Sequence, residues 1–294
     1  MLSDIYELDK ADFPPHLLHI PQPPKKLYAR GFVDLNNKKI LTIVGPRRHS
    51  SYAKECIQFL VMSLRDLPVV IVSGLAHGID SVAHMAALEA GLPTIAFPGS
   101  GLAESSLYPA PHRKLAEEIL SHGGMLLSEF EPEQKAAEWT FPRRNRLVAG
   151  IAHAILIPEA GEKSGTLITA RLACEYNRDL LVIPGNITNP LSRGVHTFLR
   201  LGATPITCTD DLREALGFER IDDTFGNEKS ETVHKNKELT EVEKQILVHL
   251  YEPCSRDILH EKSKLSIADF NAAMSMLEIK HCIKEEDGIV RLLL

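Results

Sequence analysis

The chain has 294 residues, is 44% hydrophobic and 24% charged, and carries a formal net charge of −6 at pH 7. This length predicts about two domains with a substantial apolar core. No apolar run reaches the roughly 20 residues that a membrane helix requires, the first residues lack a secretory signal, and the five cysteines form no CxxC pair. We therefore expect a cytoplasmic protein that has no membrane contact, no disulfide framework and no metal site.

Residues 1–38 are rich in proline and lack hydrophobic periodicity, so we expect an irregular N-terminal arm. In residues 39–217, short apolar runs alternate with amphipathic helical segments. This alternation predicts an α/β fold with a doubly wound, mostly parallel sheet. The strands are expected at 39–45, 68–74, 93–99, 124–130, 153–160, 179–185 and 204–207, and the helices at 52–65, 79–90, 112–121, 143–150, 166–176, 194–201 and 209–216.

The last part of the chain has a different pattern. Residues 218–238 are polar without an apolar period, which is typical of a linker, and residues 239–294 open on a capping box of Thr240 and Glu243. The order of elements there predicts a small winged-helix domain, whose third helix has few basic residues and therefore favours a protein-contact or structural role over DNA recognition. After the capped helix we expect helices near 255–261 and 266–279 and strands at 281–284 and 289–293, which turn at Asp287-Gly288.

The carboxyl ends of the expected parallel strands carry glycine, hydroxyl and basic residues. Ligands of open α/β sheets bind beyond these ends, glycine lets backbone N–H groups approach an anion, and arginine pairs with phosphate. We therefore expect a phosphate-bearing ligand at this edge. The candidate residues are Gly45, Arg47, Arg48 and Ser50 after the first strand, Ser73, Gly74, His77, Gly78 and Asp80 after the second, Gly99, Ser100 and Gly101 after the third, and Lys163, Ser164, Gly165 and Thr166 after the fifth.

The run from Phe141 to Arg146 places three arginines within four residues of an acidic protein. Such a local basic island indicates a localised polyanion site, because guanidinium groups pair with phosphate in a bidentate manner and stack on rings. Arg143, Asn145 and Arg146 are therefore candidate phosphate-binding residues. Trp139, the only tryptophan, either stacks on a base or packs against the corner at Phe141.

The motifs narrow the ligand class. The loop after the first strand is not GxGxxG, and no Gly-Lys-Ser/Thr occurs, so neither a dinucleotide cofactor nor ATP hydrolysis is supported. Asp80, Glu129 and Glu159 are conceivable carboxylate catalysts, yet each also has a structural role available at a helix start or strand end. We expect no catalytic residue, no cofactor and no metal.

Seven motifs in order resemble the DNA-processing protein A family, also called DprA or Smf. The resemblance covers about residues 26–217, and residues 240–294 are similar to the winged-helix module that many members carry. It implies an extended Rossmann fold that binds single-stranded DNA, protects it, dimerises and delivers it to a RecA-type recombinase during natural transformation, without enzymatic activity. A single-strand-binding protein is a further candidate partner. The motifs are IVGPRRHSSY, IVSGLAHGID, FPGSGLAESSLYP, LLSEF, FPRRNRLVAG, SGTLITARLA and VIPGN.

The resemblance also implies roles for individual residues. In three places this chain departs from the family pattern: Pro46 replaces a Ser or Thr, His77 stands where Arg is common, and His196 replaces a frequent Asn. The Pro-rich arm stands where many members have a sterile-alpha-motif-like domain. The matching positions are Gly45, Arg47, Arg48 and Ser50 in the phosphate loop, Ser73, Gly74, Gly78 and Asp80 in the second loop, Arg143, Asn145 and Arg146 in the Arg-Asn-Arg segment, and Lys163, Ser164, Gly165 and Thr166 in the next loop.

Two other functions fit the same pattern less well. A nucleotide-binding hydrolase of the lysine-decarboxylase-like group, acting on nucleoside monophosphates, has similar glycine-rich strand ends. That group carries Pro-Gly-Gly-x-Gly-Thr-x-x-Glu, whereas residues 159–166 lack the Gly-Gly pair, and the glutamate expected three residues after Thr166 is absent. The third possibility is an interaction hub that uses the winged helix as its docking module.

Overall fold

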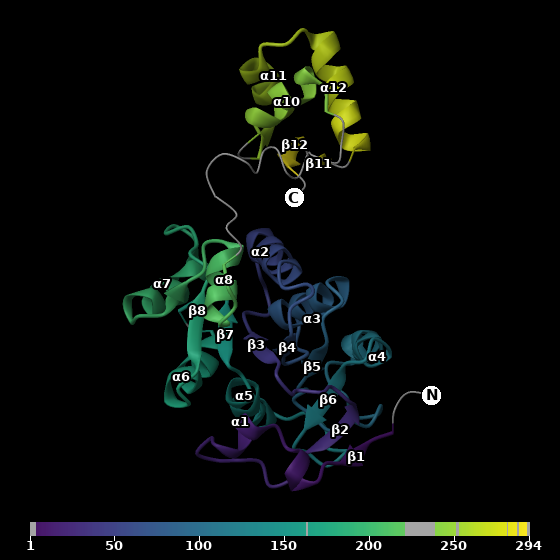
Figure 1. Cartoon of the computed structure of the whole chain (residues 1–294), viewed down its shortest axis with the longest axis vertical. Coiled ribbons are helices and arrows are strands. Elements are labelled where there is room, and N and C mark those ends of the chain that lie inside the picture. The colour runs from purple at the N-terminus through teal and green to yellow at the C-terminus, as the bar shows by residue number, and fades with distance from the viewer. Residues whose placement is uncertain are drawn as a thin grey trace. The chain divides into compact units, whose positions relative to one another are not determined.

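The computed structural model describes residues 4–162, 164–220, 239–250, 253–280, 282–286 and 288–292. The chain divides into two compact units, Met1–Ile221 and Asp222–Leu294, and each is described by itself (Figure 1). Most of the expected linker 218–238, from residue 221 onward, and the expected turn residue Asp287 lie outside the described residues.

A nine-stranded sheet forms the centre of the first unit. Its strands are β1 (Tyr6–Glu7), β2 (Tyr28–Gly31), β3 (Lys39–Ile43), β4 (Val69–Ser73), β5 (Thr94–Ala96), β6 (Met125–Ser128), β7 (Ala154–Ile157), β8 (Asp179–Val182) and β9 (Thr204–Pro205). The order across the sheet is β1-β2-β6-β5-β4-β3-β7-β8-β9. In this order, every neighbouring pair from β6 across to β9 is parallel. The pairs β1–β2 and β2–β6 are antiparallel. The predicted doubly wound, mostly parallel α/β fold is confirmed.

Helices cover both faces of this sheet (Figure 1). Successive side chains of a strand point to opposite faces, so a central strand that is apolar throughout supplies two cores. In β4, Val70 and Val72 join one core and Val69 and Ile71 the other. One face carries α2 (Ser51–Met62), α3 (Ile79–Glu89), α4 (Arg113–Ser121) and α8 (Thr209–Ala215), and the other carries α1 (Pro15–Leu18), α5 (Thr140–Gly150), α6 (Thr166–Glu175) and α7 (Arg193–Arg200). Short 3-10 turns occupy Lys10–Asp12, Ala110–His112 and Pro190–Ser192.

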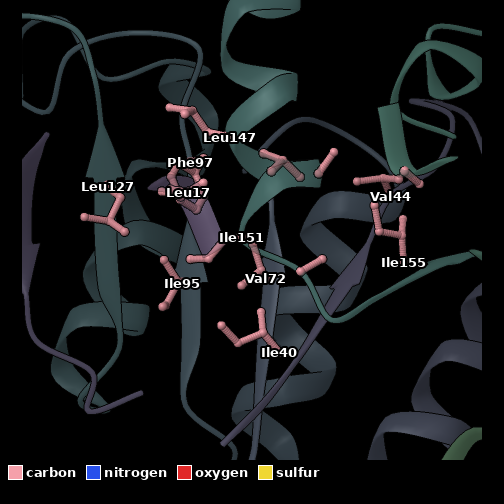
Figure 2. Packing of buried hydrophobic residues seen from close by; sticks show 14 of the residues in the cluster. Leu17, Ile40, Val44, Val72, Ile95, Phe97, Leu127, Leu147, Ile151 and Ile155 are labelled. Carbon is pink, nitrogen blue, oxygen red and sulfur yellow. The ribbon is translucent and has the colours of Figure 1, made fainter. Parts of the chain in front are cut away.

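The core under α5 shows how this helix is held (Figure 2). Leu147, Val148 and Ile151 are at most 1% exposed and pack in one cluster with strand residues such as Val72 and Ile95. Burial of side chains of this size stabilises the fold by about 1.5–3 kcal/mol each. The face of α5 that carries these three residues is therefore its inner face, and this determines where its arginines point.

The N-terminal segment differs from the expectation of an irregular arm. Strand β2 extends the sheet beyond β6, and Leu17 and Leu27 are fully buried in the core. The prolines explain why no period was visible, because they divide the segment into elements of two to four residues, and Pro15 occupies the first turn of α1. Apolar residues on separate short elements then share one core without sharing a repeat.

The second unit has its own core around Ile246, Leu259 and Phe270. Its elements are α10 (Glu241–Val248), β10 (Cys254–Ser255), α11 (Arg256–Ser263), α12 (Ile267–Ile279), β11 (Ile283–Glu286) and β12 (Ile289–Leu292), with the strand order β10-β12-β11. The capping box at Thr240 and Glu243 is confirmed, and Lys280 Nζ donates to Glu243 at 2.8 Å. The assignment as a winged helix stays a prediction. Across the residues that the structure describes, none of the helices is both long and apolar enough to cross a bilayer.

His84 of α3 provides a test of the core. Its ring is fully buried, and the Thr94 hydroxyl donates to Ile71 O at 2.9 Å, so that hydroxyl accepts from His84 Nδ1 at 2.8 Å. Burial lowers the pKa of His84 from 6.5 to about 3. The unfolded chain therefore binds a proton that the folded chain does not, and the free energy of unfolding falls as the pH drops below about 6.5.

We expect this histidine to remove about 2 kcal/mol of stability between about pH 7 and pH 5. Urea unfolding of wild type and His84→Leu at both pH values measures the difference, and the variant should lose less stability on acidification. His122→Gln, which changes an exposed histidine, serves as the control. Equal acid sensitivity in wild type and His84→Leu would contradict the assignment.

Candidate functional site

The loops after β3 and β4 contact each other at the carboxyl edge of the sheet. These strands are parallel neighbours, so their ends meet at one edge. Pro46 lacks an N–H, but its carbonyl accepts from Ile79 N at 3.2 Å, which joins the first loop to the start of α3. Gly78 has φ +82°, and a Cβ there would collide with the carbonyls of Pro46 and Arg47. Glycine is therefore required at residue 78 both for its backbone conformation and for this close approach.

A buried arginine holds the ends of β4 and β5 together. Arg144 of α5 is 6% exposed, and its Nη1 donates to Gly74 O and Phe97 O. Asp80 lies on the same side of Gly74 as Arg144, because a Cβ on Gly74 would meet both Arg144 Nη1 and Asp80 Oδ2, and this Oδ2 accepts from Ala76 N at 3.3 Å. Burial raises the pKa of Asp80 and the charge of Arg144 acts against that rise, while burial lowers the pKa of Arg144. These two side chains position the loops from inside the fold.

Arg144 was not among the predicted site residues. Its neighbours Arg143 and Arg146 were. The signal that identifies it is helical spacing, because the buried residues Leu147, Val148 and Ile151 follow it at intervals of three, four and seven. That spacing puts Arg144 on the inner face of α5, and it puts Arg143, one residue earlier, on the outer face.

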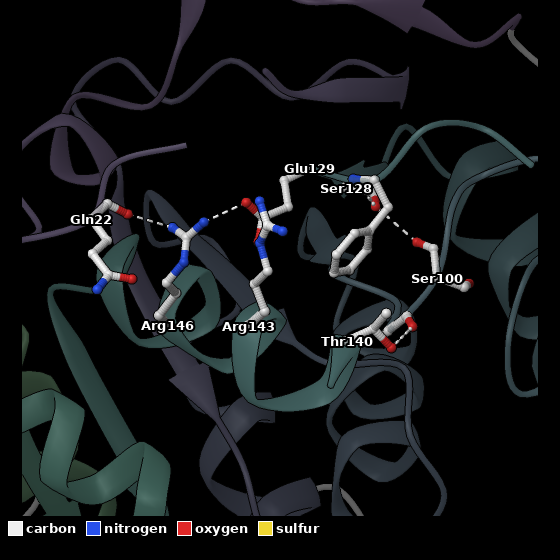
Figure 3. A network of polar contacts seen from close by, with 9 residues as sticks. Gln22, Ser100, Ser128, Glu129, Thr140, Arg143 and Arg146 are labelled. Carbon is white, nitrogen blue, oxygen red and sulfur yellow. Dashed lines mark hydrogen bonds and ion pairs between the residues drawn. The ribbon is translucent and has the colours of Figure 1, made fainter. Parts of the chain in front are cut away.

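Glu129, just beyond the end of β6, is held between the other two arginines (Figure 3). Arg146 pairs with Glu129 Oε2 and donates to Gln22 O at 2.6 Å, and its side chain is 11% exposed. Arg143 Nε lies 3.2 Å from Glu129 Oε1 without the alignment of a hydrogen bond, and its side chain is 53% exposed. The guanidinium of Arg146 is thus engaged within the fold, whereas that of Arg143 reaches solvent.

Internal hydrogen bonds also join the segments that follow β3 and β7. The chain order reverses at this pair, and in open α/β sheets ligands bind at such a reversal. Here Ser50 caps α2 and gives both its hydrogens to Glu159, its N–H to Oε2 at 3.0 Å and its hydroxyl to Oε1 at 2.5 Å. Glu159 is 2% exposed. An internal carboxylate therefore lies where the start of α2 would otherwise receive an anion.

Two arginines of the first loop remain exposed. Arg47 and Arg48 are both exposed and, among the described residues, no carboxylate lies within ion-pair distance of either. The Arg47 guanidinium lies 5.7 Å from the centre of the Phe141 ring, and that ring packs so closely on Gly99 that a Cβ there would be 2.7 Å from Phe141 Cδ1. A small pocket opens between Arg47, His77, Gly99, Tyr108 and Phe141, and Arg144 also lines it.

The remaining predicted residues take supporting positions. The Ser73 hydroxyl donates to Ile43 O at 2.6 Å, and the Ser164 hydroxyl donates to Thr166 Oγ1 at 2.8 Å at the start of α6. Lys163 lies outside the described residues. Ser73, Gly99, Ser100, Gly101 and Thr166 are buried, Gly45, Asn145 and Ser164 are partly buried, and His77 and Gly165 are exposed. The described part of the chain holds no cluster of three His, Cys, Asp or Glu residues suited to a metal ion.

The arrangement around Arg144 yields a stability test. Removing one partner of a buried charge pair leaves the other charge uncompensated, which costs about 3–5 kcal/mol. We therefore expect Asp80→Ala to lower the free energy of unfolding by about 3 kcal/mol in urea titrations. Glu117→Ala, which removes an exposed carboxylate of α4, should change stability by less than about 0.5 kcal/mol. Equal effects of the two variants would argue against a structural role for Asp80.

The sequence of this chain matches a protein family and known proteins. A family model described as DNA recombination-mediator protein A matches residues 4–217. Protein Smf of Escherichia coli is 38% identical over 210 residues, which is 71% of this chain and 56% of that protein, so the match spans little more than half the length of that relative.

Two solved structures are similar as well. The X-ray structure of DNA processing protein A from Streptococcus pneumoniae is 35% identical with a TM-score of 0.67, over 74% of this chain and 75% of that chain. DNA processing protein A from Helicobacter pylori, whose structure describes a single-stranded DNA binding mode, is 31% identical with a TM-score of 0.65, over 74% of this chain and 98% of that chain. The family that the sequence motifs resemble is confirmed: this chain belongs to the DNA recombination-mediator protein A family.

Proposed function

We propose that this chain binds single-stranded DNA at the carboxyl edge of its sheet and acts as a recombination mediator. The observation that carries the proposal is the pair of exposed arginines, Arg47 and Arg48, at the edge where α/β folds bind their ligands, with Arg47 beside the ring of Phe141. Single-stranded DNA offers phosphates to the arginines and base faces to the ring. The DNA binding described for the Helicobacter pylori relative supports the same ligand.

The proposed mechanism divides the site into two layers. Exposed Arg47, Arg48 and Arg143 contact phosphates, and Phe141 and Tyr108 present ring faces to bases. An inner layer positions these groups, and it includes residues that the sequence predicted as DNA contacts. Among them are Ser50, Asp80 and Arg146, whose polar groups are already bonded within the fold. The net charge of −6 confines the DNA to this edge.

The biological role follows as a second part of the proposal. The protein protects an incoming strand and loads a RecA-type recombinase onto it during natural transformation. It acts as a homodimer, with a single-strand-binding protein as a further partner. Family membership alone supports the recombinase, the dimer and this further partner.

The state of the carboxylates supports binding rather than catalysis. A general acid or base must reach the reacting bond. At this edge Asp80 is 6% exposed, Glu159 is 2% exposed and the side chain of Glu129 is 3% exposed, and each is bonded to neighbours. Incubation with nucleoside monophosphates, followed by chromatography, should show no release of free base, and steady release would favour the hydrolase.

Loss of the two exposed arginines should weaken DNA binding. We expect Arg47→Ala combined with Arg48→Ala to lower the affinity for oligothymidylate by about 1–3 kcal/mol, the scale of charge-assisted hydrogen bonds, as measured by fluorescence anisotropy. The matched control is Lys38→Ala combined with Arg65→Ala. It also removes two positive charges, but from a pocket at the opposite edge of the sheet. Equal losses in the two double variants would indicate only a change in net charge.

The number of phosphate contacts should appear in the salt dependence. Three described arginines and Lys163 give three to four contacts, so the slope of log affinity against log salt should lie between about −2 and −3 for single-stranded DNA. Anisotropy titrations between about 50 and 200 mM salt measure it. A slope near zero would contradict the proposal that these residues contact phosphates.

A further inference from the structure

A half-exposed aromatic residue lies beside the proposed DNA site and takes no part in the core. Trp139 precedes α5 and is 52% exposed. Its ring meets the buried Phe130 edge-on, with centroids 5.5 Å apart and planes at 84°. A single exposed aromatic side chain is ordinary on a protein surface. Trp139 differs in that a buried ring contacts it and a guanidinium group lies near it, beside the proposed DNA site.

The position of Trp139 is determined by its neighbours. The Thr140 hydroxyl is buried and donates to Gly99 O at 2.6 Å, which ties the start of α5 to the loop after β5. Phe130 follows β6 and is 5% exposed. An aromatic ring fixed in this way loses little conformational entropy when a ligand stacks on it.

A cation accompanies the ring. The Arg143 guanidinium lies 6.0 Å from the centre of the Trp139 ring and 5.8 Å from that of Phe130. Glu129 is the carboxylate between Arg143 and Arg146, and one carboxylate between two guanidinium groups leaves one net positive charge. Arg146 is buried, so this charge reaches solvent at Arg143.

Trp139 and Arg143 lie to one side of the small pocket that Arg47 and Phe141 line. Phe141 and Arg47 belong to the part of the edge formed by β3, β4 and β5, whereas Trp139 and Arg143 lie by Phe130, at the end of β6. Trp139 and Phe141 are two residues apart at the start of α5, and a helix turns by about 200° over two residues. The two rings therefore project to different sides of the helix start.

We propose that Trp139 and Arg143 form a second nucleotide subsite, in which the tryptophan stacks on an unpaired base and the arginine contacts its phosphate. The inference rests on the proposed function, because it extends the DNA path from the β3 loop across the start of α5 to β6. A strand that crosses this edge meets phosphate contacts at Arg47 and Arg48, then the rings around Phe141, and then this subsite.

Tryptophan fluorescence tests the stacking directly, because Trp139 is the only tryptophan of the chain. We expect oligothymidylate of about 12 nucleotides to quench the emission, with saturation at the same concentration as the anisotropy signal. Trp139→Ala should weaken binding by about fivefold to a hundredfold, and Trp139→Phe, which keeps a ring, should stay within about threefold of wild type. Phe32→Ala removes a 71% exposed aromatic ring after β2, at the opposite sheet edge, and should bind as wild type does.

An abasic oligomer of the same length separates stacking from a structural effect. It offers phosphates but no bases, so wild type and Trp139→Ala should bind it equally. Equal loss of affinity for both oligomers would show that the tryptophan merely supports the fold and would overturn the proposal. Unquenched emission with unchanged affinity in Trp139→Ala would overturn it too, and this is also the result expected if a protein segment occupied the ring.

These outcomes also separate this inference from the proposed function. If wild type binds oligothymidylate in a manner that depends on Arg47 and Arg48, but without any contribution from Trp139, only the second subsite is refuted. If wild type binds neither oligomer, the proposed function fails together with the subsite.

Discussion

The carboxyl edge of the sheet depends on one buried guanidinium group. Arg144 comes from α5, yet its Nη1 donates to Gly74 O and Phe97 O, which follow β4 and β5. A buried charge is stable only when its hydrogen-bonding groups are used and an opposite charge is near, and Asp80 supplies that charge. One side chain thus joins a helix to two strand ends, and the loops that carry Arg47 and His77 are built on this junction.

Helix α5 carries both buried and exposed arginines. Helical geometry turns consecutive side chains by about 100°, so neighbouring arginines of α5 have opposite environments. Arg144 is enclosed, Arg143 is largely exposed, and Arg146 is enclosed again by Glu129 and Gln22. An arginine-rich run in an acidic chain is therefore not one uniform binding patch. Part of its charge organises the edge, and part of it remains available to a phosphate.

At the point where the strand order reverses, the protein's own groups bond to one another. Glu159 accepts both hydrogens of Ser50 at the reversal point between β3 and β7. This internal bond uses the N-terminus of α2, while Arg47 lies by residues that follow β4 and β5 and Arg143 lies by Phe130, which follows β6. A ligand with several phosphates along a flexible chain suits an open edge of that kind better than a single buried phosphate does.

The sequence by itself determined the alternation of strands and helices, the parallel sheet, the capping box at Thr240 and the family, because these depend on local periodicity and on motifs that are contiguous in the chain. It could not reveal that residues 1–38 complete the sheet, because their apolar residues lie on separate short elements and share a core only in three dimensions. The sequence predicted that these loops lie at one edge of the sheet, but it could not show which of their side chains reach solvent. Whether Arg143 or Arg146 reaches solvent depends on where Glu129 and Gln22 lie, and these come from distant parts of the chain. Only the tertiary structure decided this, because hydrogen-bond partners and burial are set by packing between segments that the sequence separates.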